Sequence, residues 1–325
     1  MAPENTAAGT AAKPPIVFIV GTTTSGKTAA ALAMAQRHPV EIINADSRQV
    51  YRGMDIGTAK PSREDLANVP HHLIDVADPD EPYSLALFLD QARSAIDGVL
   101  ARGKTPLVVG GTGQYVWGLV EGWQVPQVPP QRELRARLER EAQEKGADVL
   151  HRRLQRIDAA AAERIDPRNV RRLVRALEVW EVTGHRFSSQ RRRVQPSFMP
   201  HVFGMWAPRE ELYRRINARV DAMVDAGWVD EVRRLLDAGY TPDLPSFSSA
   251  GYRELAACIE GELEREEALD LTRTAVRRLA RRQGAWFRRD DPRVTWLDGA
   301  AELTDAVRRL HGAPMVQSAS KRTET

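Results

Sequence analysis

The chain has 325 residues, of which 42% are hydrophobic and 28% charged, and its formal net charge at pH 7 is +3. This is the composition of a soluble globular protein, with a length that fits one large domain or two smaller ones. No apolar run reaches the roughly 18 residues of a membrane helix. Residues 1–15 lack the basic and apolar regions of a signal peptide, and Cys258, the only cysteine, excludes an internal disulfide. We therefore expect a cytoplasmic protein that does not associate with membranes.

The charge is distributed in blocks along the chain. Lys and Arg outnumber Asp and Glu by 17 to 10 over residues 124–200 and by 8 to 2 over residues 271–293, whereas acidic residues prevail over 1–123 and 201–270. Two basic blocks in an otherwise acidic chain indicate a polyanionic partner larger than a nucleotide. Solvated arginine-rich helices are the alternative, and composition alone favours neither interpretation.

The first part of the chain alternates between strand and helix patterns. Short apolar runs predict strands at 16–20, in "VEIINA", which leads into Asp46, and at 106–111, with an amphipathic helix in "SLALFLDQARSAIDGVLARG" before the last of them. Units of this order predict an α/β fold in which a parallel sheet is flanked by helices. Ligands bind at the carboxyl ends of such strands, so we expect Gly21, Asp46 and Gly110 to lie close together.

The pattern changes at "EGWQVPQVPP". From about 131 to 183 the chain is rich in Arg, Glu, Ala and Leu and predicts one helix after another, and "HVFGMWAP" at 201–208 again predicts a strand with helices after it. We therefore predict an all-helical domain inserted into a discontinuous α/β core, with a disordered tail at each end. The predicted boundaries are 1–14 and 313–325 for the tails, 15–123 and 200–312 for the core, and 124–199 for the insertion.

The segment "GTTTSGKT" at 21–28 matches the phosphate-binding pattern G-x-x-x-x-G-K-[ST], with a strand before it and a helix after it. Its backbone N–H groups are expected to hold phosphate oxygens, the Lys27 ammonium to add a point charge, and the Thr28 hydroxyl to bind Mg²⁺. The pattern does not specify what is attached to the diphosphate. In a nucleotide hydrolase a strand also ends in a Mg²⁺-binding aspartate, and Asp46 fits that position. The expected diphosphate-binding residues of the segment are Gly21, Thr22, Thr23, Thr24, Ser25, Gly26, Lys27 and Thr28.

The residues after Asp46 are unlike those of a nucleotide hydrolase. Together with "GTTTSGKT", the segments "DSRQVYRGMDIGTAKP", "GGTGQY", "RLVRALEVWEVTG", "LPSFSSAGYREL" and "RRLARRQGAWFRR" resemble the tRNA dimethylallyltransferases, or isopentenyltransferases, from about residue 16 to about 298. The resemblance implies a P-loop-kinase-like core with a helical insertion. It also implies transfer of dimethylallyl from its diphosphate to N6 of the tRNA adenosine on the 3′ side of the anticodon. With a single cysteine, the chain cannot form the zinc finger of eukaryotic members and resembles the bacterial form.

The resemblance also assigns catalytic roles. An exocyclic amine is a poor nucleophile because its lone pair is delocalised into the ring, so it needs an acceptor for its proton. Asp46 matches the family aspartate with that role, and Thr112 matches a threonine that faces the target base. Lys27 and Arg253 of "AGYRE" are expected to bind the diphosphate and to stabilise the charge that builds on it as it leaves.

The expected partner besides dimethylallyl diphosphate is the anticodon stem-loop of a tRNA. The target base has to leave its stack to reach a buried site, and the basic blocks would then hold RNA phosphates. We expect the enzyme to act as a monomer with Mg²⁺ as its cofactor. The candidate tRNA-binding residues are Asp46, Ser47, Arg48, Gln49, Thr112, Arg135, Arg171, Arg172, Arg175, Arg278, Arg281, Arg282, Gln283 and Trp286.

Two other classes of protein use parts of the same pattern. A nucleotide kinase or NTPase would use the 21–28 segment, but the residues after Asp46 disfavour it. A non-catalytic RNA-binding protein would use the basic blocks, but it leaves Lys27, Asp46 and Thr112 without a purpose. His71 and His72 lack further ligands at metal-site spacing, so we expect no zinc site there.

Overall fold

The computed structural model describes residues 13–189 and 193–311, and the account below concerns these residues. Of the two expected tails, only residues 13 and 14 fall within this range. They lie beside the start of strand β5 (Met199–Met205), because the Pro14 carbonyl accepts a hydrogen bond of 2.9 Å from the Met199 N–H and the Lys13 ammonium donates one of 2.7 Å to the Pro196 carbonyl.

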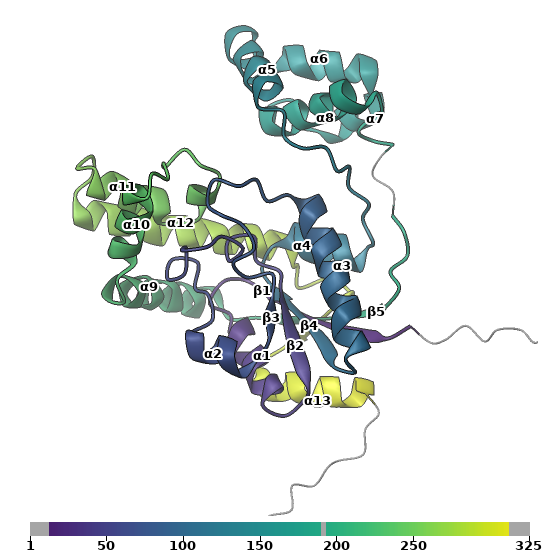
Figure 1. Ribbon diagram of the computed structural model, residues 1–325, viewed down its shortest axis with the longest axis vertical. Coiled ribbons are helices and arrows are strands. Elements are labelled where there is room, and N and C mark those ends of the chain that lie inside the picture. The colour runs from purple at the N-terminus through teal and green to yellow at the C-terminus, as the bar shows by residue number, and fades with distance from the viewer. Residues whose placement is uncertain (1–12, 190–192, 312–325) are drawn as a thin grey trace, which may run out of the picture.

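A six-stranded sheet forms the centre of the molecule, with the strand order β3-β2-β4-β1-β5-β6 (Figure 1). Every neighbouring pair is parallel, which confirms the predicted α/β fold with a parallel sheet. The predicted strands correspond to four of these six. The two outer strands were not predicted, because two and four residues are too few to carry a pattern. The bounds are β1 Pro15–Gly21, β2 Val40–Asn44, β3 His71–His72, β4 Thr105–Gly110, β5 Met199–Met205 and β6 Val294–Leu297.

Helices cover both faces of the sheet, and strand β1 shows why. Its residues alternate between two fully buried sets, with Phe18 packed in the cluster of one face and Val17 and Ile19 in that of the other. A strand buried on both sides is a continuous apolar run, as "IVFIV" is. The helices of the first face are α3 (Leu85–Ala101) and α4 (Gly113–Val120), and those of the second are α1 (Lys27–Ala35) and α13 (Ala300–His311).

A second group of helices packs beside the carboxyl ends of the strands. Its core joins buried residues of the segment after β2, such as Met54, to Trp228, Phe247 and Tyr252. This group therefore covers the edge of the sheet at which ligands of α/β proteins bind. Its elements are α9 (Arg209–Asp225), α10 (Trp228–Asp237), a short 3₁₀ helix (Ser246–Ser248), α11 (Tyr252–Ile259) and α12 (Arg265–Trp286), and the short helix α2 (Arg63–Asn68) precedes β3.

The inserted helices form a unit with a core of its own. Figure 1 shows them apart from the sheet, and their interior includes fully buried Leu138, Leu150, Leu154, Leu173 and Leu177. The predicted all-helical insertion is confirmed, while its boundaries at 124 and 199 stay a prediction. The four helices, called the helical unit below, are α5 (Arg132–Lys145), α6 (Ala147–Ile157), α7 (Ala159–Arg164) and α8 (Val170–Thr183).

The two chain segments that join this unit to the core run side by side. The Val194 N–H donates a hydrogen bond of 2.9 Å to the Gly122 carbonyl, and Trp123 and Arg193 form an antiparallel bridge. Gly122 has a φ of 61°, and a Cβ there would overlap the Val194 carbonyl oxygen, so only glycine fits. Among the described residues, no helix combines the length and apolar character that crossing a bilayer requires.

Candidate active site

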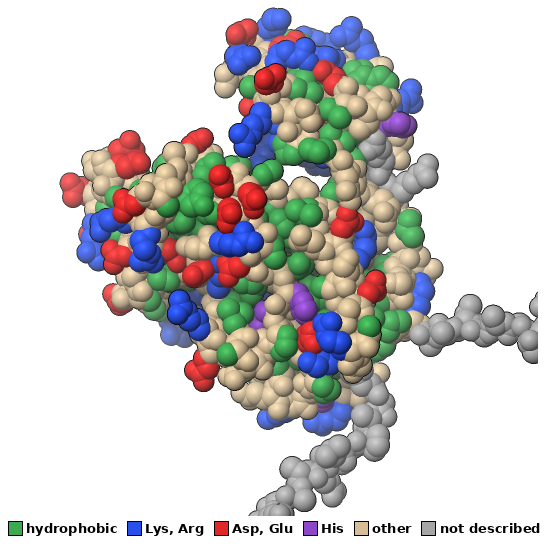
Figure 2. Space-filling model, in the orientation of Figure 1, with side chains coloured by type: hydrophobic (Ala, Val, Ile, Leu, Met, Phe, Trp, Pro, Cys, Tyr) green, Lys and Arg blue, Asp and Glu red, His purple; other side chains and the backbone are tan. Residues whose placement is uncertain are grey.

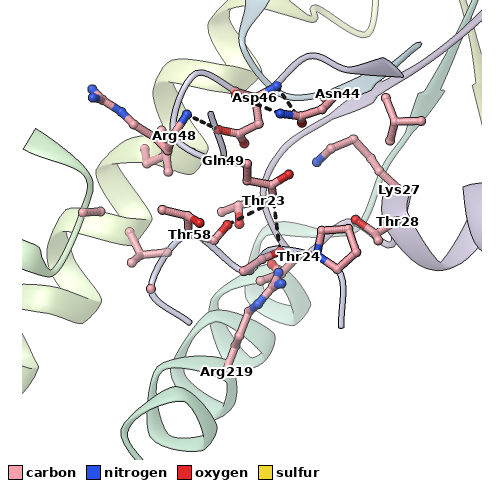
Figure 3. Close-up of a pocket in the computed structure, with 18 of the residues that line it drawn as sticks. Thr23, Thr24, Lys27, Thr28, Asn44, Asp46, Arg48, Gln49, Thr58 and Arg219 are labelled. Atoms are coloured by element: carbon pink, nitrogen blue, oxygen red, sulfur yellow. Dashed lines mark hydrogen bonds between the residues drawn. The ribbon is translucent and has the colours of Figure 1, made fainter. Parts of the chain in front are cut away.

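A cavity of about 470 Å³ lies at the carboxyl ends of β1, β2 and β4. Its walls come from the 21–28 loop, the segment after β2, the stretch 57–61 and helices α9, α10 and α12. Figure 3 shows Lys27 and Thr28 entering from the start of α1, Asp46 from the end of β2, and Arg219 from α9. The parallel topology brings these distant segments together, as expected for Asp46 and the loop.

The 21–28 loop has the backbone of an anion-binding turn. Thr24 has a φ of 61° and Gly26 a φ of 95°, both in the left-handed region, and helix α1 begins at Lys27. The hydroxyl oxygens of Thr24 and Ser25 are buried and have no hydrogen-bond partner among the described residues. Unpaired buried oxygens beside a helix N-terminus suit a ligand that supplies the missing partners.

Three of the charged side chains that line the cavity act on one another. Burial lowers the pKa of the Lys27 ammonium to about 8, the Asp46 carboxylate opposes this shift, and the Arg219 guanidinium adds to it. The Lys27 ammonium also donates a hydrogen bond of 2.6 Å to the Thr22 carbonyl within its own loop. Two cations beside one carboxylate leave the cavity suited to a group that carries more than one negative charge.

The Asp46 carboxylate is held in place by its neighbours. The side chain of Asn44 donates to the Leu73 carbonyl at 2.9 Å and accepts from the Asp46 N–H at 3.1 Å, which fixes the turn after β2. Asp46 Oδ1 accepts the Arg48 N–H at 2.9 Å. The carboxylate is thus oriented through one oxygen while its side chain remains half-buried at the cavity wall.

Thr112 supports the same turn from the end of β4. Its N–H donates to the Ala45 carbonyl at 3.2 Å, and its Oγ1 accepts the Ser47 N–H at 2.9 Å. Thr112 also donates to Ser47 Oγ at 3.2 Å. Thr112 lies beside the cavity rather than in its wall, and its hydrogen bonds to Ala45 and Ser47 hold the residues on either side of Asp46.

Two glutamines predicted to contact tRNA bind the protein itself. Gln283 is 6% exposed and its Oε1 accepts the Thr23 N–H at 2.6 Å, which ties helix α12 to the 21–28 loop. The Gln49 amide donates to the carbonyls of Thr58 at 3.1 Å and Ala59 at 2.9 Å. Both side chains line the cavity, and in this structure each positions one of its walls.

The structure does not place Arg253 where the sequence predicted it. Its side chain is exposed on α11, lies outside the cavity wall and donates to the Pro242 carbonyl at 2.9 Å. Arg219 of α9 occupies the expected position instead. The available signal was its spacing, because Arg219 lies between Ile216 and Val220 on the buried face of α9, where an arginine is unusual.

Basic side chains of the helical unit face the core near this cavity. Arg171 and Arg172 are exposed at the start of α8. In the core, burial lowers the pKa of the Arg48 guanidinium, and the positive charge of Arg171 lowers it further. Arg48 is anchored by a hydrogen bond of 3.1 Å to the Pro245 carbonyl. Figure 2 shows a recess between the helical unit and the core, with Lys and Arg side chains on the helical side.

Arg135 and Arg175 have internal partners. Both donate to the carboxylate of Glu178, which is fully buried, at 2.7 Å from Arg135 Nε and 2.6 Å from Arg175. The same carboxylate accepts the Gln131 N–H at 2.8 Å, and Arg175 reaches the Val128 carbonyl at 3.0 Å. These arginines connect α5, α8 and the incoming chain segment, and their contact with tRNA stays a prediction.

The basic face of α12 is exposed. Arg278, Arg281 and Arg282 lie on it, and Arg281 donates to the Tyr213 hydroxyl at 3.2 Å. Trp286 is 40% exposed at the end of the helix, where its carbonyl accepts the indole N–H of Trp117 at 3.1 Å. The described residues contain no cluster of three His, Cys, Asp or Glu side chains that could hold a metal ion.

The fold and the cavity define an α/β enzyme that brings a lysine, an arginine and a carboxylate to one anion-binding site, with a separate helical unit beside it. The chain belongs to the IPP transferase family, whose model matches residues 49–290, and an isopentenyl transferase model matches residues 14–76. The resemblance seen in the sequence is thereby confirmed.

Proteins of known name agree with this assignment. The chain is 51% identical over 275 residues to a tRNA dimethylallyltransferase of Roseiflexus sp. (strain RS-1), covering 85% of this chain and 90% of the relative. It is 52% identical over 289 residues to that of Roseiflexus castenholzii, covering 89% and 94%. Among solved structures, the tRNA isopentenylpyrophosphate transferase of Bacillus halodurans is 38% identical with a TM-score of 0.67, over 92% of this chain and 97% of that one. A eukaryotic dimethylallyltransferase acting on tRNA is 26% identical with a TM-score of 0.78, over 94% and 81%.

Proposed function

We propose that the protein is a tRNA dimethylallyltransferase. It transfers the dimethylallyl group of dimethylallyl diphosphate to N6 of the adenosine 3′-adjacent to the anticodon in certain tRNAs, giving N6-dimethylallyladenosine and releasing diphosphate. Family membership supports this reaction. The observation that carries it is the shared cavity of Lys27, Arg219 and Asp46, which offers two cations to a diphosphate and a carboxylate to the attacking amine.

The diphosphate is proposed to bind the 21–28 loop. The Lys27 ammonium and the Arg219 guanidinium lie in the cavity wall, where they would stabilise the charge that builds on the bridging oxygen as the carbon–oxygen bond breaks. The N6 lone pair forms the new carbon–nitrogen bond, and the bonding electrons of the broken bond leave with the diphosphate. The 21–28 loop and Lys27 would grip the same group before and after this step.

Asp46 is proposed as the acceptor of the N6 proton. Asp46 Oδ1 accepts the Arg48 N–H, whereas Oδ2 accepts no hydrogen bond from the described residues. Oδ2 is therefore the oxygen proposed to take the proton from the substrate. The turn that carries it is held by Asn44 and by Thr112, through the Ser47 N–H. Proton transfer requires the base and the amine to be held close together and aligned, and a base on a fixed turn can be held in this way.

We propose that Mg²⁺ accompanies the diphosphate. The Thr28 hydroxyl is the protein oxygen that fits, because Thr28 lines the cavity beside Lys27 at the start of α1 (Figure 3). Mg²⁺ takes oxygen ligands and is commonly held by one or two protein groups together with substrate phosphates and water. When bound, the ion offsets the negative charge of the diphosphate.

The anticodon stem-loop is proposed to lie in the recess between the helical unit and the core. Arg171, whose charge acts on Arg48, borders it from one side with the exposed Arg172 next in the chain, and Arg48 borders it from the other, which suits RNA phosphates. The target adenine would turn out of the loop to reach Asp46. As the sequence led us to expect, we further propose that the enzyme acts as a monomer in the cytoplasm.

The test is a transfer assay with two donors. The protein is incubated with radiolabelled dimethylallyl diphosphate and an anticodon stem-loop, and separately with labelled ATP. A stem-loop that carries guanosine in place of the target adenosine is the control. Label in the adenosine RNA alone, without ATP, supports the proposal. Phosphate release from ATP would instead indicate an NTPase, and RNA binding with neither activity would indicate an RNA-binding protein.

A further inference from the structure

A buried carboxylate outside the cavity holds one of its walls. Glu231 of α10 is 2% exposed, and its two oxygens accept four hydrogen bonds. Three come from consecutive backbone N–H groups, at 2.8 Å from Asp55, 2.7 Å from Ile56 and 3.2 Å from Gly57. The fourth, of 2.7 Å, comes from the Tyr252 hydroxyl. A single side chain therefore satisfies three backbone donors of a segment far away in the sequence.

The backbone held by Glu231 continues directly into the cavity wall. Gly57, Thr58 and Ala59 all line the cavity, and the Gln49 amide holds the carbonyls of the latter two from the other side. Ala59 has a φ of 55°, an unfavourable value for a residue with a Cβ, so the stretch 57–59 relies on these contacts to keep its shape. Glu231 and Gln49 act as the two supports of this wall.

The same carboxylate also helps to hold the wall against an indole ring. A Cβ on Gly57 would overlap the Trp228 ring, so this backbone and Trp228 are in direct contact. Trp228 is fully buried and lines the cavity, and its ring meets that of Tyr252 edge-on at a centroid distance of 5.8 Å. Through the Tyr252 hydroxyl, Glu231 also fixes the ring that supports Trp228.

This part of the cavity is apolar. Beside Trp228 it is lined by Val220 and Met223 of α9 and Val276 of α12, with the Arg219 guanidinium on the same helix as the first two. An apolar surface next to a diphosphate-binding cation suits the five-carbon chain of the donor rather than a charged or hydrogen-bonding group.

We infer that Glu231 is a positioning residue for dimethylallyl diphosphate. It holds the stretch 57–59 against the Trp228 ring and so fixes the shape of the wall on which the dimethylallyl chain would pack. The inference rests on the proposed function, because it takes the donor as the ligand of this cavity. Removing the carboxylate leaves three backbone N–H groups without their acceptor and frees the wall to move, whereas the RNA-facing residues keep their contacts.

The test separates affinity for the donor from stability and RNA binding. In Glu231→Ala we expect KM for dimethylallyl diphosphate to rise about 10- to 100-fold, the range typical of outer-shell groups that orient the ligands of a metal ion. The dissociation constant of the stem-loop should stay within about twofold, well below that range. Glu231→Gln keeps one acceptor oxygen and should fall between the wild type and the alanine variant. This milder variant also serves if Glu231→Ala fails to fold.

The matched control is Glu41→Gln. Glu41 is also a buried carboxylate, 3% exposed at the start of β2, and it accepts hydrogen bonds from His72 at 2.7 Å and Arg102 at 2.6 Å, away from the cavity wall. We expect it to lower Tm as Glu231→Gln does, without a change in KM for the donor. If the two variants lower Tm alike and neither changes that KM, Glu231 is only structural and the inference is wrong.

Measuring donor binding in the absence of RNA distinguishes a failure of this inference from a failure of the proposed function. The dissociation constant of dimethylallyl diphosphate is measured by calorimetry on the same proteins. If the wild type binds the donor but transfers nothing, the proposed reaction fails while the effect of Glu231 on binding still decides the inference. If wild type and Glu231→Gln bind the donor equally, the inference fails whatever the reaction.

Discussion

Lys27 and Asp46 face each other across one cavity, and burial lowers the pKa of the Lys27 ammonium to about 8 although the charge of the Asp46 carboxylate acts in the opposite direction. The cation that would hold the leaving diphosphate is therefore close to the base that would take the proton from the attacking amine. A loop residue and a residue after the next strand meet in this way because parallel strands end at the same edge of the sheet.

The Lys27 pKa predicts a pH dependence of donor use. The charged ammonium binds the diphosphate and is the form present below about pH 8, so kcat/KM for dimethylallyl diphosphate is expected to fall as the pH rises through 8. A Lys27→Met variant should have a lower kcat/KM without this decline. The pH profile of both proteins is measured at saturating stem-loop. A wild-type profile that stays flat from about pH 7 to about pH 9.5 contradicts the assignment.

Asp46→Asn is expected to bind both substrates nearly as the wild type does and to lose turnover by about 10²–10⁴-fold, the usual effect of removing a positioned base. The amide keeps an oxygen that can accept the Arg48 N–H, so the turn should survive. Single-turnover transfer, together with separate binding titrations of donor and stem-loop, provides the measurement. Wild-type kcat in this variant would remove Asp46 from the role of base.

Substitutions of Arg219 and Arg253 are expected to have different effects on donor kinetics. Arg219→Gln should raise KM for the donor and lower kcat together, because a charge in the cavity wall helps in the ground state and more in the transition state. Arg253→Gln should change neither by more than about twofold, because its hydrogen bond is to the Pro242 carbonyl on the surface. The kinetics of the two variants show whether Arg219, which lines the cavity in the structure, or Arg253, which the sequence predicted, binds the diphosphate. A large decrease in activity in Arg253→Gln alone would return that arginine to the site.

The exposed arginines of α8 are expected to grip RNA. Charge reversal in Arg171→Glu/Arg172→Glu should raise KM for the stem-loop and reduce the log–log salt slope of binding by about 0.7–0.9 for each RNA phosphate that is no longer neutralised. Donor affinity should not change, because neither residue lines the cavity. Binding is titrated at several salt concentrations. If the salt slope of the variant equals that of the wild type, Arg171 and Arg172 do not contact RNA phosphates and the basic face of α12 would carry RNA binding.

Arg175 should behave differently from its two neighbours. Its guanidinium bonds Glu178, which is fully buried, so Arg175→Gln is expected to destabilise the protein by about 1–3 kcal/mol through a poorly paired carboxylate. Thermal unfolding with and without stem-loop measures this. Unchanged Tm with weakened RNA binding would show that Arg175 acts on RNA directly.

Much of the fold follows from local patterns. The apolar runs at 16–20 and 106–111 correspond to β1 and β4, and the helix expected after the 21–28 segment is α1, which begins at Lys27. Such patterns are readable because a buried strand must be apolar on both faces and a loop followed by a helix has its own residue signals. Strands β3 and β6 were missed because their pairing comes from neighbours across the sheet and not from their own residues.

The sequence by itself determined the family, the reaction class and the position of the loop and Asp46, because these depend on long contiguous segments. Only the tertiary structure decided that Arg219 and not Arg253 lines the cavity, that Gln283 is buried against Thr23, and that Glu231 holds the wall at 57–59. Those contacts join residues that are far apart in the chain. Their geometry depends on how helices α9 to α12 pack over the ends of the strands, and no local pattern records that packing.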